Sequence, residues 1–262
     1  MITNKNIDNG NKFDWGLASS DYAKYRDIYP EEFYKRIVDL SYCTNNQKVL
    51  DLGTGTGVLP RNMAKYGAEF VGTDISENQI KYAKELSEKA SLKINYIVSS
   101  AEDLEFDNNC FDIVTACQCF MYFDKSIILP KIHRFLKDDG HFLILYMAWL
   151  PFESEIAKTS EDLVLKYNPS WTGRGMTKYN LEEPEWSKKY FSLSNAITYE
   201  TDIPFTRETW HGRIKACRGI GASSLSESEI DNWEKEHLKY LKTVPNEFTI
   251  PHYVSILDLK KK

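Results

Sequence analysis

Hydrophobic and polar residues alternate along the chain in blocks that predict strands and helices in turn. Continuous apolar runs that end in an acid or in glycines lie at 48–53 and 68–74, a pattern typical of strands buried on both faces. Further apolar runs at 94–100, 111–117 and 141–147 predict three more strands. Because helical spacing fills most of the segments between these runs, the order predicts a parallel sheet with helices on both faces.

The expected helices are marked by apolar spacing and by signals at their ends. Pro30 opens one helix, and another runs from about 125 to 136 before an Asp-Asp-Gly turn. The segments that begin at Ser76 and Ser226 carry Gln or Glu three residues later, which matches a capping box. We therefore expect helices over about 76–89 and 227–242.

After residue 147 the regular order breaks. A predicted helix at 155–167 is followed by NPSWTGRGM, rich in Gly, Pro and Trp, before strand patterns resume at 195–205 and 249–259. We expect an α/β fold, with a doubly wound, mostly parallel seven-stranded sheet and a helical, aromatic lid insertion.

The predicted organisation is a single domain over 13–262 that follows a flexible tail at 1–12. The lid is expected to consist of about 13–45 and 148–192.

Composition and charge narrow the function classes. The 262 residues carry 38 acidic and 33 basic side chains, a formal charge of −5, and this disfavours general binding to nucleic acid. No stretch approaches the roughly 18 apolar residues that cross a bilayer, and the N-terminus has no apolar signal core, so a cytoplasmic protein without a membrane partner is expected. The five cysteines show no framework spacing, and no metal site is predicted.

The most informative motif is VLDLGTGTG at 49–57, between a predicted strand and a predicted helix. Its glycines, Gly53, Gly55 and Gly57, allow a tight turn and a close approach of the backbone to a ligand. The dinucleotide fingerprint needs a small residue where Val58 stands, and the P-loop sequence Gly-Lys-Ser/Thr is absent. The motif therefore does not favour a pyrophosphate cradle.

Two acids end neighbouring predicted strands at this motif. Asp51 would repel a pyrophosphate but attract a cationic ligand, and Asp74 is placed to accept the hydroxyls of a ribose. Together they indicate a nucleoside that carries positive charge and no phosphates. S-adenosylmethionine, with a ribose, a sulfonium and an ammonium group, fits this description.

At these residues the chain resembles the class I S-adenosylmethionine-dependent methyltransferases, in particular the small-molecule branch of the ubiquinone/menaquinone-biosynthesis and trans-aconitate methyltransferase type. The motifs that carry the resemblance are VLDLGTGTG, VGTDIS, SSAEDLEFDNNCFDIV, ACQCFMYFD and FLKDDGHFLI. The likeness covers about 13–147 well and 205–258 more weakly. It implies a Rossmann-like methyltransferase fold, S-adenosyl-L-methionine as cofactor, S-adenosyl-L-homocysteine as product and a small-molecule acceptor; the oligomeric state stays open.

The resemblance also implies roles for individual residues. Asp74 would bind the ribose hydroxyls with Ile75 against the adenine, and the N-terminal YAKYRDIYP would bring Tyr22 and Arg26 to the methionine carboxylate. The implied cofactor-binding residues are Tyr22, Arg26, Asp51, Gly53, Thr54, Gly55, Asp74, Ile75, Ala101, Glu102, Cys117 and Gln118.

This chain departs from the family pattern at three places. Ser100 stands where an Asp is common, Asp27 replaces a proline, and Met121-Tyr122 replaces His-Trp. No role of that histidine is carried over.

The acceptor side of the site is less clearly marked. Tyr122 and His211 are the candidates for a general base. Core packing and a solvated basic helix face are the alternatives for the substrate-binding candidates, which are Tyr122, Tyr146, Trp149, Trp171, Trp210 and Arg213.

Two other functions stay open at this point. One is a catalytically silent protein that binds S-adenosylmethionine as a sensor or partner module. The other is a nucleotide-dependent oxidoreductase on a similar sheet, which Val58 and Asp51 disfavour.

Overall fold

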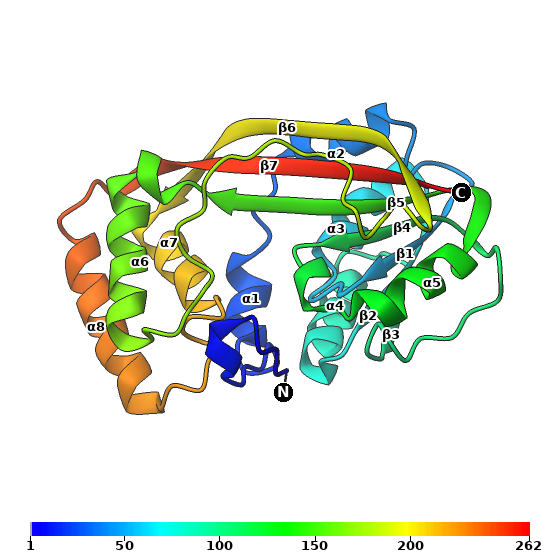
Figure 1. The fold of residues 1–262 in the computed structure, drawn as a ribbon. Coiled ribbons are helices and arrows are strands. Elements are labelled where there is room, and N and C mark those ends of the chain that lie inside the picture. Colours follow the sequence, from blue (N-terminus) through cyan, green and yellow to red (C-terminus); the bar gives the residue numbers. More distant parts are fainter. Residues whose placement is uncertain (1) are drawn as a thin grey trace. The chain divides into compact units, whose positions relative to one another are not determined.

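The computed structural model describes residues 2–262, and its central element is a seven-stranded sheet (Figure 1). The strand order is β3-β2-β1-β4-β5-β7-β6. The strands are β1 (Lys48–Leu52), β2 (Glu69–Asp74), β3 (Asn95–Val98), β4 (Phe111–Cys117), β5 (Leu136–Trp149), β6 (Phe191–Thr206) and β7 (Glu247–Lys261).

The topology produces a switch point beside β1. β1 pairs in parallel with β2 and with β4, and the pairs β2–β3 and β4–β5 are also parallel. The chain moves outward from β1 to β3 and then returns to β4 on the other side of β1. In open α/β sheets ligands bind at the carboxyl ends of the strands where the order reverses, here between β1 and β4. The expected doubly wound, mostly parallel sheet is confirmed.

Two helices begin at the capping residues that the sequence predicts. Ser226 and Glu229 form the predicted capping box at the start of α8, and Ser76 accepts a hydrogen bond from the Gln79 amide at the start of α4. No helix within residues 2–262 is long and apolar enough to cross a membrane. The helices are α1 (Ser19–Tyr25), α2 (Glu31–Asp39), α3 (Val58–Met63), α4 (Glu77–Lys89), α5 (Lys125–Phe135), α6 (Glu155–Tyr167), α7 (Arg207–Lys215) and α8 (Glu227–Leu241).

Contacts along the chain divide it into two compact units. The first unit comprises the segment up to Ile28 together with Ala148–Tyr179 and Glu200–Tyr253, and the second unit comprises Tyr29–Met147, Asn180–Tyr199 and Val254–Lys262. α2, which we placed in the lid, clusters with the sheet in the second unit. α7 and α8, which we placed outside the lid, cluster with α6 in the first unit.

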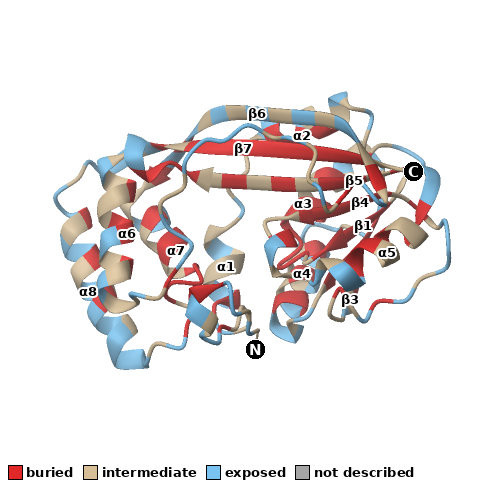
Figure 2. Ribbon diagram, viewed as in Figure 1, coloured by how far each residue is buried: buried red, intermediate tan, exposed pale blue. Residues whose placement is uncertain are grey.

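Each unit has its own buried interior. In the second unit the strands β1 and β4 are buried almost throughout, as Figure 2 shows. This agrees with the sequence, because strands covered on both faces read as continuous apolar runs. The first unit buries large aromatic side chains, among them Trp149, Trp171, Trp210 and Trp233.

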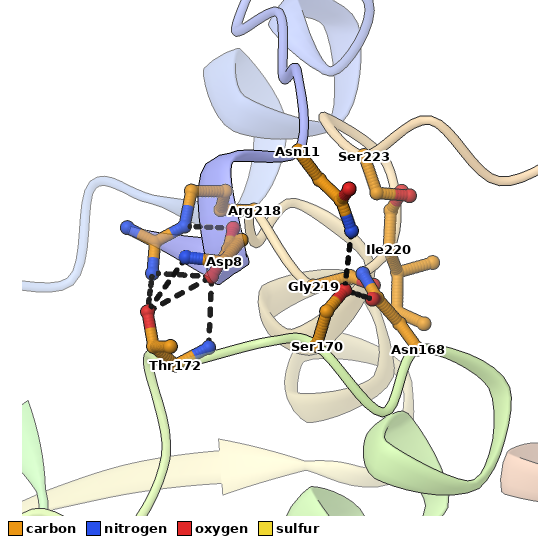
Figure 3. A network of polar contacts seen from close by, with 9 residues as sticks. All are labelled: Asp8, Asn11, Asn168, Ser170, Thr172, Arg218, Gly219, Ile220 and Ser223. Atoms are coloured by element: carbon orange, nitrogen blue, oxygen red, sulfur yellow. Dashed lines mark hydrogen bonds and ion pairs between the residues drawn. The ribbon is translucent and has the colours of Figure 1, made fainter. Parts of the chain in front are cut away.

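Of the expected flexible tail, 1–12, the structure describes residues 2–12, and these are packed in the first unit. Arg218 Nε donates to Asp8 Oδ2 over 2.6 Å, and the Thr172 amide and hydroxyl donate to Asp8 Oδ1 over 2.8 and 2.9 Å (Figure 3). Ile2 and Phe13 form an antiparallel bridge. A carboxylate that is only 4 % exposed needs such partners. The partners lie more than 160 residues away in sequence, so local pattern gave no sign of them.

Candidate functional site

The glycine motif forms a loop of left-handed residues at the end of β1. Gly53, Gly55 and Gly57 have φ angles of +60°, +57° and +73°. A Cβ at Gly53 would lie 2.8 Å from the Cys119 Cβ, and a Cβ at Gly57 would lie 2.2 Å from the Tyr96 hydroxyl. Two of the three glycines are therefore required by contacts inside the protein, in addition to any approach to a ligand.

Asp74 ties the end of β2 to the glycine loop. Its Oδ2 accepts from the Gly55 amide over 2.9 Å, and its Oδ1 accepts from the Ser76 amide over 2.9 Å. Burial raises the pKa of Asp74, although these two amides oppose the shift. Because each carboxylate oxygen has two lone pairs, both oxygens can still accept a hydroxyl of a sugar.

Exposed apolar side chains stand beside this carboxylate. Ile75 follows Asp74 directly and is 52 % exposed. Val98 pairs with Asp74 in the register of β2 and β3 and is 48 % exposed. Branched apolar groups at two neighbouring strand ends suit a flat aromatic ring such as a nucleobase.

Asp51 is buried at the end of β1. It is 1 % exposed, and the Thr115 hydroxyl donates to its Oδ1 over 2.6 Å. Burial raises the pKa of Asp51 to about 6; hydrogen bonds from Thr115 and Thr54 oppose the shift, and the charge of Asp74 adds to it. A positive charge nearby would favour the ionised carboxylate, whereas a phosphate would disfavour it.

The end of β4 adds a second group of contacts at the switch point. Gln118 has a φ angle of +66°, and its side-chain amide donates to the carbonyl of Met147. Cys117 Sγ lies 3.5 Å from the Tyr29 hydroxyl, to which it donates. Cys119 Sγ donates to the carbonyl of Leu52 over 3.0 Å. Tyr29 was missed as a site residue, although it belongs to the quoted YAKYRDIYP segment.

Ala101 and Glu102, the expected contacts of the adenine edge, follow β3. Ala101 is buried in the core of the second unit. Glu102 Oε1 accepts from the Asp124 amide over 2.8 Å, so its carboxylate caps the start of α5. Tyr122 packs against the same core, and Tyr146 lies half-buried on β5.

Tyr22 and Arg26 lie together in the first unit. The Arg26 guanidinium sits 4.7 Å from the centre of the Tyr22 ring, and Trp15 contacts that ring edge-on at 5.9 Å. The cation and the aromatic ring stabilise each other. The expected contact of Tyr22 and Arg26 with a methionine carboxylate stays a prediction.

The three tryptophans expected to line an acceptor site are interior residues of the first unit. Trp210 is fully buried and donates to the Ser160 hydroxyl over 2.9 Å. Trp149 donates to Glu161 over 2.7 Å, with the guanidinium of Arg213 4.8 Å from its ring. Trp171 is 3 % exposed. These contacts correspond to the core-packing alternative.

His211, a candidate base, lies in a histidine pair. Its Nδ1 is 2.9 Å from Nδ1 of His237, and its Nε2 is 3.7 Å from Glu234. Its ring stacks on Trp233 at 5.2 Å. Burial lowers the pKa of His211, which disfavours the charged form of the ring.

Comparisons with known proteins match this chain to methyltransferases. Residues 50–144 match the family described as "Methyltransferase domain". The chain is 28% identical over 187 residues to the ubiquinone biosynthesis O-methyltransferase of Bradyrhizobium diazoefficiens, with 69% of this chain and 70% of that protein covered. It is 35% identical over 114 residues to the demethylmenaquinone methyltransferase of Thermotoga maritima, with 42% of this chain and 48% of that protein covered.

The fold is also similar to that of solved structures. The YcgJ protein from Bacillus subtilis superimposes with a TM-score of 0.54 at 20% identity, and the match covers 89% of this chain and 99% of that one. The chain spans about half the length of several curated relatives it matches. The matched segment 50–144 contains the glycine loop and both strand-end carboxylates. Over this segment the chain is therefore similar to a methyltransferase domain.

Proposed function

We propose that this chain is an enzyme that transfers the methyl group of S-adenosylmethionine to a small-molecule acceptor. The observation that carries the proposal is the Asp74 carboxylate, which organises the glycine loop through Gly55 and stands beside the exposed Ile75. One residue thus links a hydrogen-bond acceptor for a ribose, an apolar platform for a base and the backbone turn at the switch point.

The residues present fit this cofactor. Asp74 would hold the ribose, and Ile75 with Val98 would pack against the adenine. The buried Asp51, whose pKa burial raises to about 6, would be stabilised in its ionised form by the positive charge of the sulfonium or ammonium group. When bound, the cofactor supplies a methyl group already activated by the sulfonium.

The protein's contribution to the reaction is proposed to be alignment. A methyl transfer in line needs the acceptor atom close to the methyl group and water kept out, and little further chemistry from the enzyme. Tyr122 and His211 are the candidate bases for an acceptor with a high pKa. The relatives named for ubiquinone biosynthesis and for demethylmenaquinone favour a quinone-related acceptor.

The first test is calorimetric titration of the protein with S-adenosylhomocysteine. We expect binding to the native chain, and we expect Asp74→Ala to weaken it about tenfold or more, because a charge-assisted hydrogen bond contributes about 1.5–3 kcal/mol. Glu77→Ala, which removes an exposed carboxylate three residues away, is the matched control and should bind normally.

Two outcomes would contradict the assignment. If Asp74→Ala bound S-adenosylhomocysteine with unchanged affinity, Asp74 would not be a cofactor-binding residue. Preferential binding of a dinucleotide would favour the oxidoreductase alternative. Turnover of the cofactor with a panel of small acceptors then separates an enzyme from a silent sensor, which would bind the cofactor and transfer nothing.

A further inference from the structure

Tyr29 brings a phenol to the switch point from a distant part of the chain. It immediately precedes Pro30, the N-cap residue of α2, in the second unit. Its ring stacks on the buried Phe33 with 4.6 Å between centroids, and Tyr34 contacts it edge-on at 6.3 Å. These contacts fix the ring, and the hydroxyl oxygen accepts from Cys117 Sγ over 3.5 Å.

The register of the sheet places this hydroxyl beside the glycine loop. Leu52 of β1 pairs with Ala116 of β4, so Gly53 and Cys117 follow at the same sheet edge. Tyr29 and Cys117 are both only partly buried, and the contact between them lies at that edge. This is the edge at which open α/β sheets bind their ligands.

The strand order indicates which end of a nucleoside would meet Tyr29. Asp74 and Ile75 end β2, which lies on one side of β1, whereas Cys117 ends β4 on the other side. A nucleoside whose ribose is held by Asp74 and whose base rests on Ile75 must extend its remaining substituent across the end of β1. That substituent would pass the buried Asp51 and reach the end of β4.

We propose that the Tyr29 hydroxyl oxygen contacts the transferable methyl group of the cofactor and holds it in line with the acceptor. The inference rests on the proposed function, because that function supplies the cationic substituent. A methyl group on a sulfonium carries positive charge on its hydrogens, which a phenol oxygen accepts as weak C–H···O hydrogen bonds. Cys117 acts as a positioning residue that orients the hydroxyl.

The test compares two probes that differ at this point. Sinefungin carries an ammonium group where the cofactor carries its methyl sulfonium, whereas S-adenosylhomocysteine carries neither the methyl nor the charge. Tyr29→Phe keeps the ring, its stacking and its volume but removes the oxygen. We expect it to weaken sinefungin binding three- to tenfold in calorimetric titrations, and to change the affinity for S-adenosylhomocysteine less than twofold.

Tyr66→Phe is the matched control. Its hydroxyl donates to Glu31 at the start of the same helix, α2, over 2.7 Å, and its loss should leave the ratio of the two affinities unchanged. Equal losses for both probes in Tyr29→Phe, or no loss for either, would overturn the inference. Failure of the native chain to bind S-adenosylhomocysteine would instead reject the proposed function itself, so the two failures are distinguishable.

Discussion

At the scale of single residues, Asp51 shows how a buried carboxylate lowers the stability of the folded chain. The carboxyl group lies almost fully buried, with the Thr115 hydroxyl as a partner, and burial raises its pKa to about 6 from an ordinary 3.8. The unfolded chain therefore loses this proton at lower pH than the folded chain does. The contribution of Asp51 to the free energy of unfolding is therefore largest below about pH 4 and falls as the pH rises to about 6.

We therefore expect Asp51→Asn to stabilise the protein without ligand. At pH 7.5 the gain in the free energy of unfolding should be up to about 3 kcal/mol, because the amide needs no ionisation in the buried site. The gain should disappear near pH 4, where Asp51 is protonated in both states. The same variant should bind S-adenosylhomocysteine more weakly, since its ammonium group loses a negative partner.

Thermal unfolding across this pH range measures the effect. Asp139→Asn is the control, because the Asp139 side chain is 95% exposed and should change stability by no more than about 0.5 kcal/mol. The prediction would be contradicted if Asp51→Asn were equally destabilised at pH 4 and pH 7.5. The interactions of the carboxylate in the folded chain would then outweigh the free-energy cost of burying it.

At the scale of elements, the N-terminal segment is held by one buried ion pair. The side chains of Asp8 and Arg218 are 5% and 9% exposed, and Thr172 completes the cluster. A buried ion pair does not by itself make a protein more stable than apolar residues at the same positions would. The removal of one partner, however, leaves an uncompensated buried charge. The segment that continues into α1, with Tyr22, is thereby attached to the first unit.

Asp8→Ala should therefore destabilise the first unit by about 3–5 kcal/mol in urea unfolding. The double variant Asp8→Ala/Arg218→Met should recover much of this loss, because no charge is then left buried without its partner. Glu208→Ala, which breaks an exposed pair with Lys24 in the same unit, should cost no more than about 1 kcal/mol. Equal costs for the two single variants would mean that the Asp8 pair is effectively solvated.

At the scale of the whole molecule, the two units should respond differently to acid. The first unit buries His237 and His252, whose pKa values burial lowers to about 3. The contacts of His237 include His211, Ser160 and Trp233. Since the unfolded chain takes up these protons at about pH 6.5, folding is opposed increasingly below that value.

We expect the first unit to lose up to about 2 kcal/mol per histidine between pH 6.5 and pH 5. Tryptophan fluorescence follows this unit, because five of the six tryptophans lie in it and only Trp186 lies in the second. His237→Gln should reduce the pH dependence by about half. A fluorescence transition whose midpoint is constant over this range would contradict the prediction.

The sequence located most of the second unit because its signals are local. Apolar runs with strand lengths, glycines after β1 and acids at the ends of β1 and β2 all depend on neighbours in the chain. The structure brings Asp51, Gly55 and Asp74 to the same edge of one sheet, as parallel strands require. The position of Tyr29 at Cys117 could not be derived in this way, because it depends on how α2 packs 88 residues from β4.

The aromatic residues show the opposite limit. Tryptophans such as Trp149 and Trp210 occur both in ligand-binding surfaces and in protein cores. Only their burial and their hydrogen bonds to Glu161 and Ser160 show that they are core residues here. The same holds for residues 2–12, whose polar composition suggested a flexible tail. A buried ion pair is invisible in a sequence until its partner is known.

The sequence by itself thus determined the presence of the sheet, the succession of strands and helices along the chain, the glycine turn and the two carboxylates beside it. These features follow from periodicity and turn chemistry, which act over a few residues. The tertiary structure alone decided which polar groups are buried, which glycines are forced by neighbouring side chains and which hydroxyl stands at the switch point. Those outcomes depend on contacts between segments far apart in the chain, where burial and charge are set by the packing as a whole.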